Sequence, residues 1–248
     1  CRRERGDVLA LDRFAVASIR AVVDRVLAAG AEPRWLSSED VATLLRAAGI
    51  EVAASERVAA REAAAAAERI GYPLVAKLLS PDILHKSDVG GVIVGLRSAQ
   101  EVSAAASRLT ELAQSRGARF DGVLLQREVR GGSEALVGVT TDPTFGPLLV
   151  CGLGGVLVEL LRDVSFRLTP VSRLDAEEMI ASLRSAKLLD GYRGAPAGDR
   201  AALAGIIQRI SALVEVAPEI RELDLNPVKV LEPGRGAVVV DARVRLGL

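Results

Sequence analysis

Short apolar runs alternate with capped helical segments from residue 74 onwards, and this alternation restricts the possible folds more than any other feature. The runs at 74–79 and 92–96 are short and followed by polar or glycine-rich stretches, as buried strands are. Ser98 and Glu101 then form a capping box, which predicts a helix directly after the second run. Strands mixed with helices in this order, without an internal repeat, predict an α+β fold with two lobes.

The expected division of the chain follows from its helical segments and its punctuation by glycine and proline. Residues 1–36 carry a helical pattern, and we expect them to be a linker or helical lead-in from a preceding domain. Residues 37–127 are expected to form the N-terminal lobe and residues 128–248 the C-terminal lobe, with a hinge near 126–130. The alanine-rich stretch 56–70 predicts one continuous helix.

Composition excludes several classes of function. The chain has 248 residues, with 32 basic and 32 acidic side chains, and only 4 Phe, 2 Tyr and 1 Trp. A neutral chain with so few aromatic rings does not favour nucleic-acid binding, and its longest apolar run, 145–158, is too short to span a membrane. Two cysteines, Cys1 and Cys151, form no disulfide framework and favour a reducing, cytoplasmic location.

The first candidate site is the loop that follows the run 74–79. Only four of the 32 basic residues are lysines, and two of them flank the single histidine of the chain. The strand delivers one lysine, and the loop then carries the histidine, the second lysine, a serine and paired glycines: Lys77, His85, Lys86, Ser87, Gly90 and Gly91. Ammonium groups and open backbone amides bind polyphosphates, and a histidine among them can act as acid, base or phosphate acceptor. The alternative is a surface loop with an incidental histidine.

The second candidate site is a strand near the C-terminus. Alternation places Glu222, Asp224 and Asn226 on one face of it, and Asp241 follows in a neighbouring strand. Such a set of oxygen ligands suits a hard octahedral cation that also holds phosphates. The alternative is an amphipathic edge strand with a solvated acidic face.

The third candidate site is the glycine-rich turn 152–155, which includes Gly154 and Gly155. It follows a strand and resembles a phosphate-binding turn, but it lacks the spacing and terminal lysine of a P-loop. Taken alone, such a turn is more often a tight connection between a strand and a helix, and only together with the other two sites does it suggest a wall of a nucleotide cleft.

Several of these motifs together resemble one family. The stretch 75–92, with His85-Lys86-Ser87-Asp88-Val89-Gly90-Gly91, is similar to the opening of the ATP-grasp domain in NDP-forming acyl-CoA synthetases, the ADP-forming acetate–CoA ligases related to the succinyl-CoA synthetase β subunit. Further similar motifs follow in order at 142–147, 152–155, 163–168 and 222–227. The resemblance implies an ATP-grasp fold whose two lobes enclose a nucleotide cleft.

The resemblance also implies an activity. The family converts acyl-CoA, ADP and phosphate to a carboxylic acid, CoA and ATP, and a phosphohistidine carries the phosphoryl group. The CoA-binding and CoA-ligase modules of the family lie outside these 248 residues. The expected partner is therefore such a module, as a separate subunit or as part of the same polypeptide, and we expect an oligomer.

Residue roles are carried over from the resemblance position by position. His85 matches the relaying histidine and Lys77 the lysine that holds nucleotide phosphates, while Asp224, Asn226 and Asp241 match the Mg²⁺ ligands, with Glu222 in support. The remaining positions expected to contact ATP or ADP are Lys86, Ser87, Gly90, Gly91, Gln126, Glu128, Val129, Glu134, Gly154, Gly155 and Arg167.

Two other functions remain open at this point. An ATP-grasp carboxylate–amine or carboxylate–thiol ligase acting through an acyl phosphate would share Lys77 and the metal ligands but would not need His85. A non-catalytic nucleotide-sensing domain of a multidomain regulator would bind nucleotide without turnover.

Overall fold

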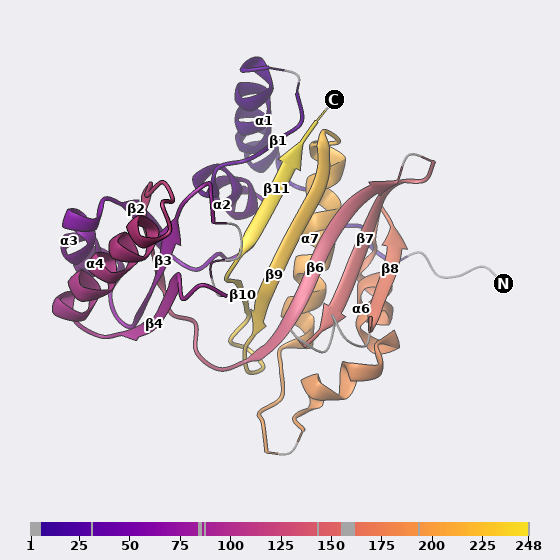
Figure 1. Cartoon of the computed structure of the whole chain (residues 1–248). Helices are drawn as coiled ribbons and strands as arrows, with labels where there is room; N and C mark the ends of the chain where they lie inside the picture. The colour runs from indigo at the N-terminus through magenta and orange to yellow at the C-terminus, as the bar shows by residue number, and fades with distance from the viewer. Residues whose placement is uncertain are drawn as a thin grey trace. The chain divides into compact units, whose positions relative to one another are not determined.

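The computed structural model describes residues 6–30, 32–83, 86, 88–142, 144–154, 162–192 and 194–247. The chain separates into two compact units, a larger one made of Cys1–Val52 and Gly131–Leu248 and a smaller one made of Ala53–Arg130. Both units combine helices with strands (Figure 1), as the sequence predicts. None of the helices in the described residues has the length and apolar character needed to cross a membrane.

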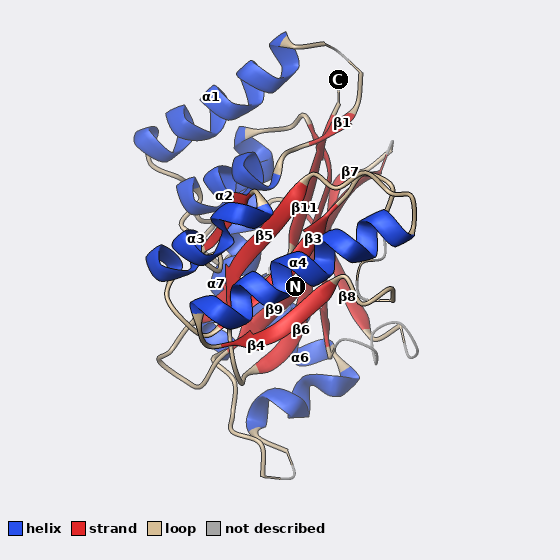
Figure 2. Ribbon diagram, turned by 60° about the vertical axis from the view of Figure 1, so that its left-hand side comes forward, coloured by secondary structure: helices blue, strands red, loops and turns tan. Residues whose placement is uncertain are grey.

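The smaller unit is an antiparallel sheet with two helices on one face (Figure 2). Its four strands lie in the order β2-β5-β3-β4. The elements in chain order are β2 (Ser55–Val58), the short η1 (Ala60–Glu62), α3 (Ala63–Ile70), β3 (Leu74–Leu79), β4 (Val92–Leu96), α4 (Ala99–Ser115) and β5 (Gly122–Arg127). The Ser98 hydroxyl accepts the backbone N–H of Glu101 at 3.2 Å, which caps α4 as its sequence predicts.

The prediction of one helix over 56–70 is wrong at its start. Glu56 to Val58 belong to β2, which pairs with β5, and the α-helix begins only at Ala63. Val58 is buried in the same apolar core as the alanines of α3. Pairing with β5 and burial of this side chain therefore override the helix propensity of the alanine-rich stretch that follows.

The larger unit is a seven-stranded antiparallel sheet with a layer of helices on one face. Its strands lie in the order β1-β11-β9-β6-β7-β8, and β10 pairs with β9 beside this path. The strands are β1 (Arg34–Trp35), β6 (Ser133–Asp142), β7 (Gly146–Leu153), β8 (Val164–Leu168), β9 (Ile220–Val230), β10 (Ala237–Val239) and β11 (Ala242–Leu246). The helices are α1 (Arg13–Ala28), α2 (Ser38–Ala47), α6 (Arg173–Ser182), η2 (Arg184–Asp190) and α7 (Arg200–Val216).

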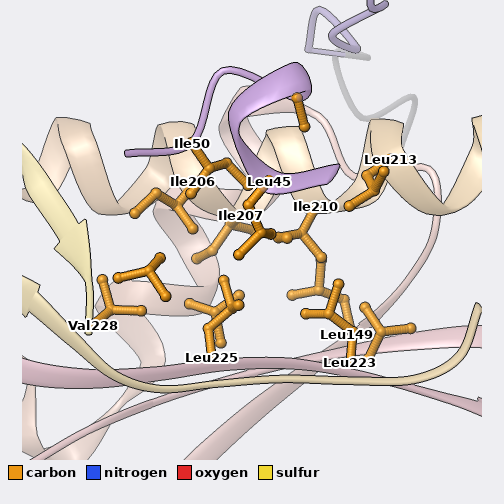
Figure 3. Close-up of a cluster of buried hydrophobic side chains, with 14 of the residues drawn as sticks. Leu45, Ile50, Leu149, Ile206, Ile207, Ile210, Leu213, Leu223, Leu225 and Val228 are labelled. Carbon is orange, nitrogen blue, oxygen red and sulfur yellow. The ribbon is translucent and has the colours of Figure 1, made fainter. Parts of the chain in front are cut away.

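The core of the larger unit lies between its sheet and its helices. Ile206, Ile207 and Ile210 of α7 point towards Leu223 and Leu225 of β9 (Figure 3), and all five are buried. The core is almost wholly aliphatic, as the scarcity of aromatic residues requires. β6, β7, β9 and β11 therefore each pack one of their two faces against the helices.

We expected boundaries between residues 36 and 37 and between residues 127 and 128. The units instead divide after Val52 and after Arg130. Ile19 and Val23 of α1 and Leu44 and Leu45 of α2 are buried in the core of the larger unit, so residues 13–47 pack with the C-terminal part of the chain. The second crossing, between Arg130 and Gly131, lies next to the stretch expected as a hinge. Periodicity indicated the helix within residues 1–36 but could not show which core it enters.

Candidate functional site

Lys77 lies on the face of the smaller sheet that points away from α3 and α4. Its neighbours along β3, Ala76 and Leu78, are buried in the core beneath those helices. Because strand side chains alternate, the Lys77 side chain leaves from the opposite face. Val92 of β4 and Leu124 of β5 are its cross-strand neighbours, so Lys77 stands in the interior of this face.

The loop after β3 closes through a glycine. The Gly91 N–H donates to the Lys86 carbonyl at 2.7 Å, and the Gly91 carbonyl accepts the Leu78 N–H at 2.8 Å. A Cβ at position 91 would lie 3.0 Å from the Lys86 carbonyl oxygen, and Gly90 has φ of 77°, so both positions favour glycine. The Gly91 amide therefore closes the turn. His85 and Ser87 lie outside the described residues.

Two hydrogen bonds attach the start of this loop to the connection between α4 and β5. An Asp82 carboxylate oxygen accepts the Arg119 N–H at 2.7 Å, and the Leu79 carbonyl accepts the Asp121 N–H at 2.8 Å. The loop that carries Lys86 therefore leaves the sheet from a defined starting point.

The residues expected near adenine lie at and beyond the end of β5. Gln126 is buried and shares the face of the sheet that carries Lys77. The Glu128 N–H donates to the Pro73 carbonyl at 2.9 Å, and its carboxylate pairs with Arg130 at 2.9 Å. Val129 is half-buried. The hydrogen bond to Pro73 holds the backbone at Glu128, directly after the end of β5.

The acidic residues of β9 share one face, as the alternation predicts. Leu223 and Leu225 are buried against the helices, so Glu222 and Asp224 point to the other face, which the described helices of this unit leave open. Asn226 is exposed, and its N–H donates to the Asp241 carbonyl at 3.1 Å. Glu222, Asp224, Asn226 and Asp241 are called the acidic cluster below.

The acidic cluster has an electrostatic cost in the absence of a cation. Burial raises the pKa of Asp224, and the nearby carboxylates of Asp241 and Glu222 raise it further, while Arg243 opposes the rise. Within the described residues, no three His, Cys, Asp or Glu side chains form a metal site by themselves. The amide of Asn226 and ligands from a bound molecule would have to complete a coordination shell.

Two arginines of β11 belong to the same open face, and the sequence analysis missed them. The register places Arg243 opposite Asp224 and Arg245 opposite Glu222. Arg245 and Glu222 form an ion pair at 3.9 Å. Alternation of arginine with buried Val244 and Leu246 was the signal for their direction, but their proximity to the acids depends on strand register.

Glu134 and Gly154 lie at the end of the open face. Glu134 is opposite Lys229 in the register of β6 and β9, and its carboxylate accepts a hydrogen bond from the Lys229 ammonium at 2.8 Å. The Gly154 N–H donates to the Glu134 carbonyl at 2.7 Å, so this amide is engaged within the fold. Gly155 lies outside the described residues.

Arg167 is not on the open face. Its guanidinium donates to the Glu178 carboxylate of α6 at 3.2 Å and lies 3.9 Å from Asp175. Its neighbour Phe166 is exposed, whereas the Arg167 side chain points to the helix layer. The structure therefore does not bring Arg167 together with the acidic cluster.

Comparison with known proteins places the chain in a family. A family model described as an ATP-grasp domain matches residues 26–246. The 4-hydroxybutyrate–CoA ligase (ADP-forming) of Nitrosopumilus maritimus is 46% identical over 187 residues, which are 75% of this chain and 27% of that protein. The β subunit of acetate–CoA ligase (ADP-forming) II of Pyrococcus furiosus is 39% identical over 230 residues, which are 91% of this chain and 96% of that subunit. The chain thus spans about a quarter of the first relative and nearly all of the second.

Solved structures agree with these relatives. Structures of the dinucleotide-forming acetyl-coenzyme A synthetase 1 of Ca. Korarchaeum cryptofilum match 92% of this chain and 100% of the compared chain. The identity is 38%, with a TM-score of 0.84 for a complex with coenzyme A and Ca-AMPCP. The TM-score is 0.79 for a complex with coenzyme A and Mg-AMPPCP, in which a phosphohistidine segment points towards the nucleotide-binding site. The chain therefore belongs to the ATP-grasp family, in the group that contains the β subunits of ADP-forming acetate–CoA ligases.

Proposed function

We propose that the chain is the nucleotide-binding and phosphoryl-relay part of an ADP-forming acyl-CoA synthetase. The whole enzyme converts acyl-CoA, ADP and phosphate to a carboxylic acid, CoA and ATP, and the reaction is reversible. The observation that carries the proposal is an open sheet face bearing the acidic cluster in a chain that matches a β subunit almost end to end.

Asp224, Asn226 and Asp241 would hold Mg²⁺, with Glu222 in support. Their oxygen atoms are the ligand type that Mg²⁺ prefers, and the nucleotide phosphates complete its shell. The pKa of Asp224 is raised in the absence of a cation. A divalent cation beside the carboxylate favours its charged form and so lowers this pKa. When bound, Mg²⁺ neutralises charge on the phosphates during transfer.

The nucleotide phosphates are held by Lys77, with Lys86, Ser87, Gly90 and Gly155 in support. A lysine in the interior of a sheet face, rather than at its edge, is a positioned point charge. Gln126, Glu128 and Val129 face adenine mainly through their backbone groups, and Glu134 contacts the ribose. Gly91, Gly154 and Arg167 are left out of the proposed site because the structure engages them elsewhere.

His85 carries the phosphoryl group between ATP and a CoA-ligase module. In the direction of acyl-CoA synthesis, an imidazole nitrogen forms a bond to the γ-phosphorus while the bond from that phosphorus to the bridging oxygen breaks, and ADP leaves. The phosphoryl group of His85 then passes to the module, which returns His85 to its starting state. The partner is a CoA-binding and CoA-ligase module, and we propose an oligomeric assembly in the cytoplasm.

The relay is tested in the holoenzyme with His85→Ala and His85→Asn. Both variants are expected to lose acyl-CoA synthesis by about 10³-fold or more, because no other described group replaces the phosphate acceptor. Lys187→Ala, an exposed lysine of η2, is the control and should keep wild-type activity. Full activity of His85→Ala would contradict the relay and would favour a direct ligase acting through an acyl phosphate.

The phosphate role of Lys77 is tested by equilibrium binding of Mg·ADP to the holoenzyme. Lys77→Ala is expected to weaken binding by about 10-fold to 100-fold, the scale of one charge-assisted hydrogen bond. Lys187→Ala again serves as the control. Unchanged binding by Lys77→Ala would remove this residue from the site.

A further inference from the structure

Arg243 and Asp224 form a cross-strand pair on the open face of the larger sheet. The register of β11 and β9 places them directly opposite each other. Their strand neighbours Val244 and Leu225 are buried on the helix side, so both charged side chains leave from the other side. Side chains that are opposite in an antiparallel pair have Cβ atoms about 5 Å apart.

The guanidinium of Arg243 makes no hydrogen bond or ion pair with any described residue, although the side chain is exposed and lies beside acids. Arg245, two residues further along the same face, is paired with Glu222 at 3.9 Å. Arg243 acts on Asp224 through charge alone, where it opposes the rise in the pKa of that carboxyl. Its fork of N–H donors therefore remains available to a ligand.

Binding of a divalent cation to the acidic cluster changes the balance of charge around Arg243. The cation neutralises Asp224 and Asp241, so the positive charge of Arg243 is no longer matched by its cross-strand neighbour. Any phosphate held by the same cation lies within reach of a side chain as long as arginine. A planar guanidinium binds two phosphate oxygens at once, which the lysines of the chain cannot do.

We propose that Arg243 binds the β-phosphate of the nucleotide, beside the cation held by the acidic cluster. This inference rests on the proposed function, because it needs a Mg·nucleotide complex at Asp224. It assigns to β11 a phosphate-binding residue, in addition to the Asp241 that precedes this strand. Arg243 thus lies opposite Asp224 in the absence of nucleotide and contacts phosphate in its presence.

The test compares binding of Mg·ADP and of AMP to the holoenzyme by isothermal titration calorimetry. Arg243→Ala is expected to weaken Mg·ADP by about 10-fold to 100-fold and to leave AMP unchanged, because AMP has no β-phosphate. Arg243→Lys retains the charge without the fork and is expected to fall between wild type and Arg243→Ala. Arg46→Ala, an exposed arginine of α2 in the helix layer, is the matched control and should bind both ligands like wild type.

The outcomes separate this inference from the proposed function. Equal Mg·ADP affinity of wild type and Arg243→Ala overturns the inference and leaves the proposed function intact. Equal losses for AMP and Mg·ADP also overturn it, because they indicate a general disturbance of the site. Absence of Mg·ADP binding to the wild-type holoenzyme overturns the proposed function itself. Arg243→Lys, which keeps a cation opposite Asp224, preserves the test if Arg243→Ala does not fold.

Discussion

At the scale of single residues, surroundings decide what a side chain can do. Cys151 and Asp199 illustrate this in opposite directions. Cys151 of β7 is fully buried, and burial raises the pKa of its thiol to about 12. Asp199 accepts backbone N–H groups from Ala202, Gly234 and Gly236, and these bonds lower its pKa despite partial burial. Neither environment follows from residue type alone.

Cys151 is predicted to be an unreactive thiol in the folded protein. The thiolate is the reactive form, and it is scarce at pH 8 when the pKa is about 12. In a Cys1→Ser background, Ellman's reagent should label less than about one tenth of the protein before unfolding and one thiol per chain in denaturant. Rapid stoichiometric labelling of the native protein would show that β7 is accessible.

Asp199 is predicted to stabilise the fold in a pH-dependent way. Its folded pKa lies below the usual 3.8, so its contribution is complete above that value and is lost as pH falls through the folded pKa. Asp199→Ala removes the cap of α7 and should reduce the free energy of unfolding by about 1–2 kcal/mol at pH 7.

Urea unfolding of wild type and Asp199→Ala at a series of pH values measures this effect. The two stabilities should converge as the pH decreases below about 4. The same gap at pH 7 and at the lowest pH would show that the carboxylate charge is not the cause. Glu111→Ala, an exposed carboxylate of α4, is the control for general charge effects.

Residue-level prediction succeeded where side-chain direction follows from alternation, and failed where it depends on pairing. Glu222 and Asp224 share a face because of their spacing along one strand. Arg243 lies beside Asp224 because β11 pairs with β9 in one register, which no spacing in a single strand reveals. The same limit applies to Arg167, whose contact with Glu178 depends on how α6 packs against β8.

At the scale of elements, one face of β9 contributes side chains to the core and the other carries the proposed ligands of the cation. Leu223 and Leu225 lie in the core beneath α7 (Figure 3). Asp224, between them in the sequence, faces the open side because strand side chains alternate. Neighbouring positions along one strand should therefore respond to substitution in different ways.

Leu225→Ala is predicted to reduce the stability of the fold, whereas Asp224→Asn is predicted to reduce the binding of Mg·ADP. Leu225→Ala leaves a cavity in the core and should reduce the free energy of unfolding by about 2–5 kcal/mol. Asp224→Asn should change it by less than about 1 kcal/mol but should abolish detectable Mg·ADP binding, because a ligand of the cation loses its charge. Chemical denaturation and calorimetry of both variants measure this, and loss of stability without loss of binding in Asp224→Asn would contradict the account.

Element type was predicted correctly where the signals are local, for helices and for strands. Ser98 caps α4 within its own segment, and the apolar runs 74–79 and 92–96 coincide with β3 and β4. β2 was mistaken for the start of a helix, since a four-residue strand is recognisable only through its partner β5. Element type thus follows from the sequence where hydrogen bonds are local, and less well where they are distant.

At the scale of the whole molecule, the N-terminal segment and the C-terminal part of the chain share one core. α1 and α2 add Ile19, Leu44 and Leu45 to the apolar cluster built on β6, β7 and β9, and the smaller unit is inserted between the two parts in sequence. A linear division at residues 36 and 127 cannot represent such an insertion, which explains the difference from the expected boundaries.

Transfer of labelled phosphate tests the central claim most directly. The holoenzyme is incubated with Mg²⁺ and [γ-³²P]ATP, and the phosphorylated residue is identified by peptide mapping. The account predicts a phosphoramidate on His85 that is labile in acid and stable in base, is present in Lys187→Ala and is absent from His85→Asn. Absence of label from the His85 peptide, while the wild-type holoenzyme still makes acyl-CoA from ATP, would contradict the account.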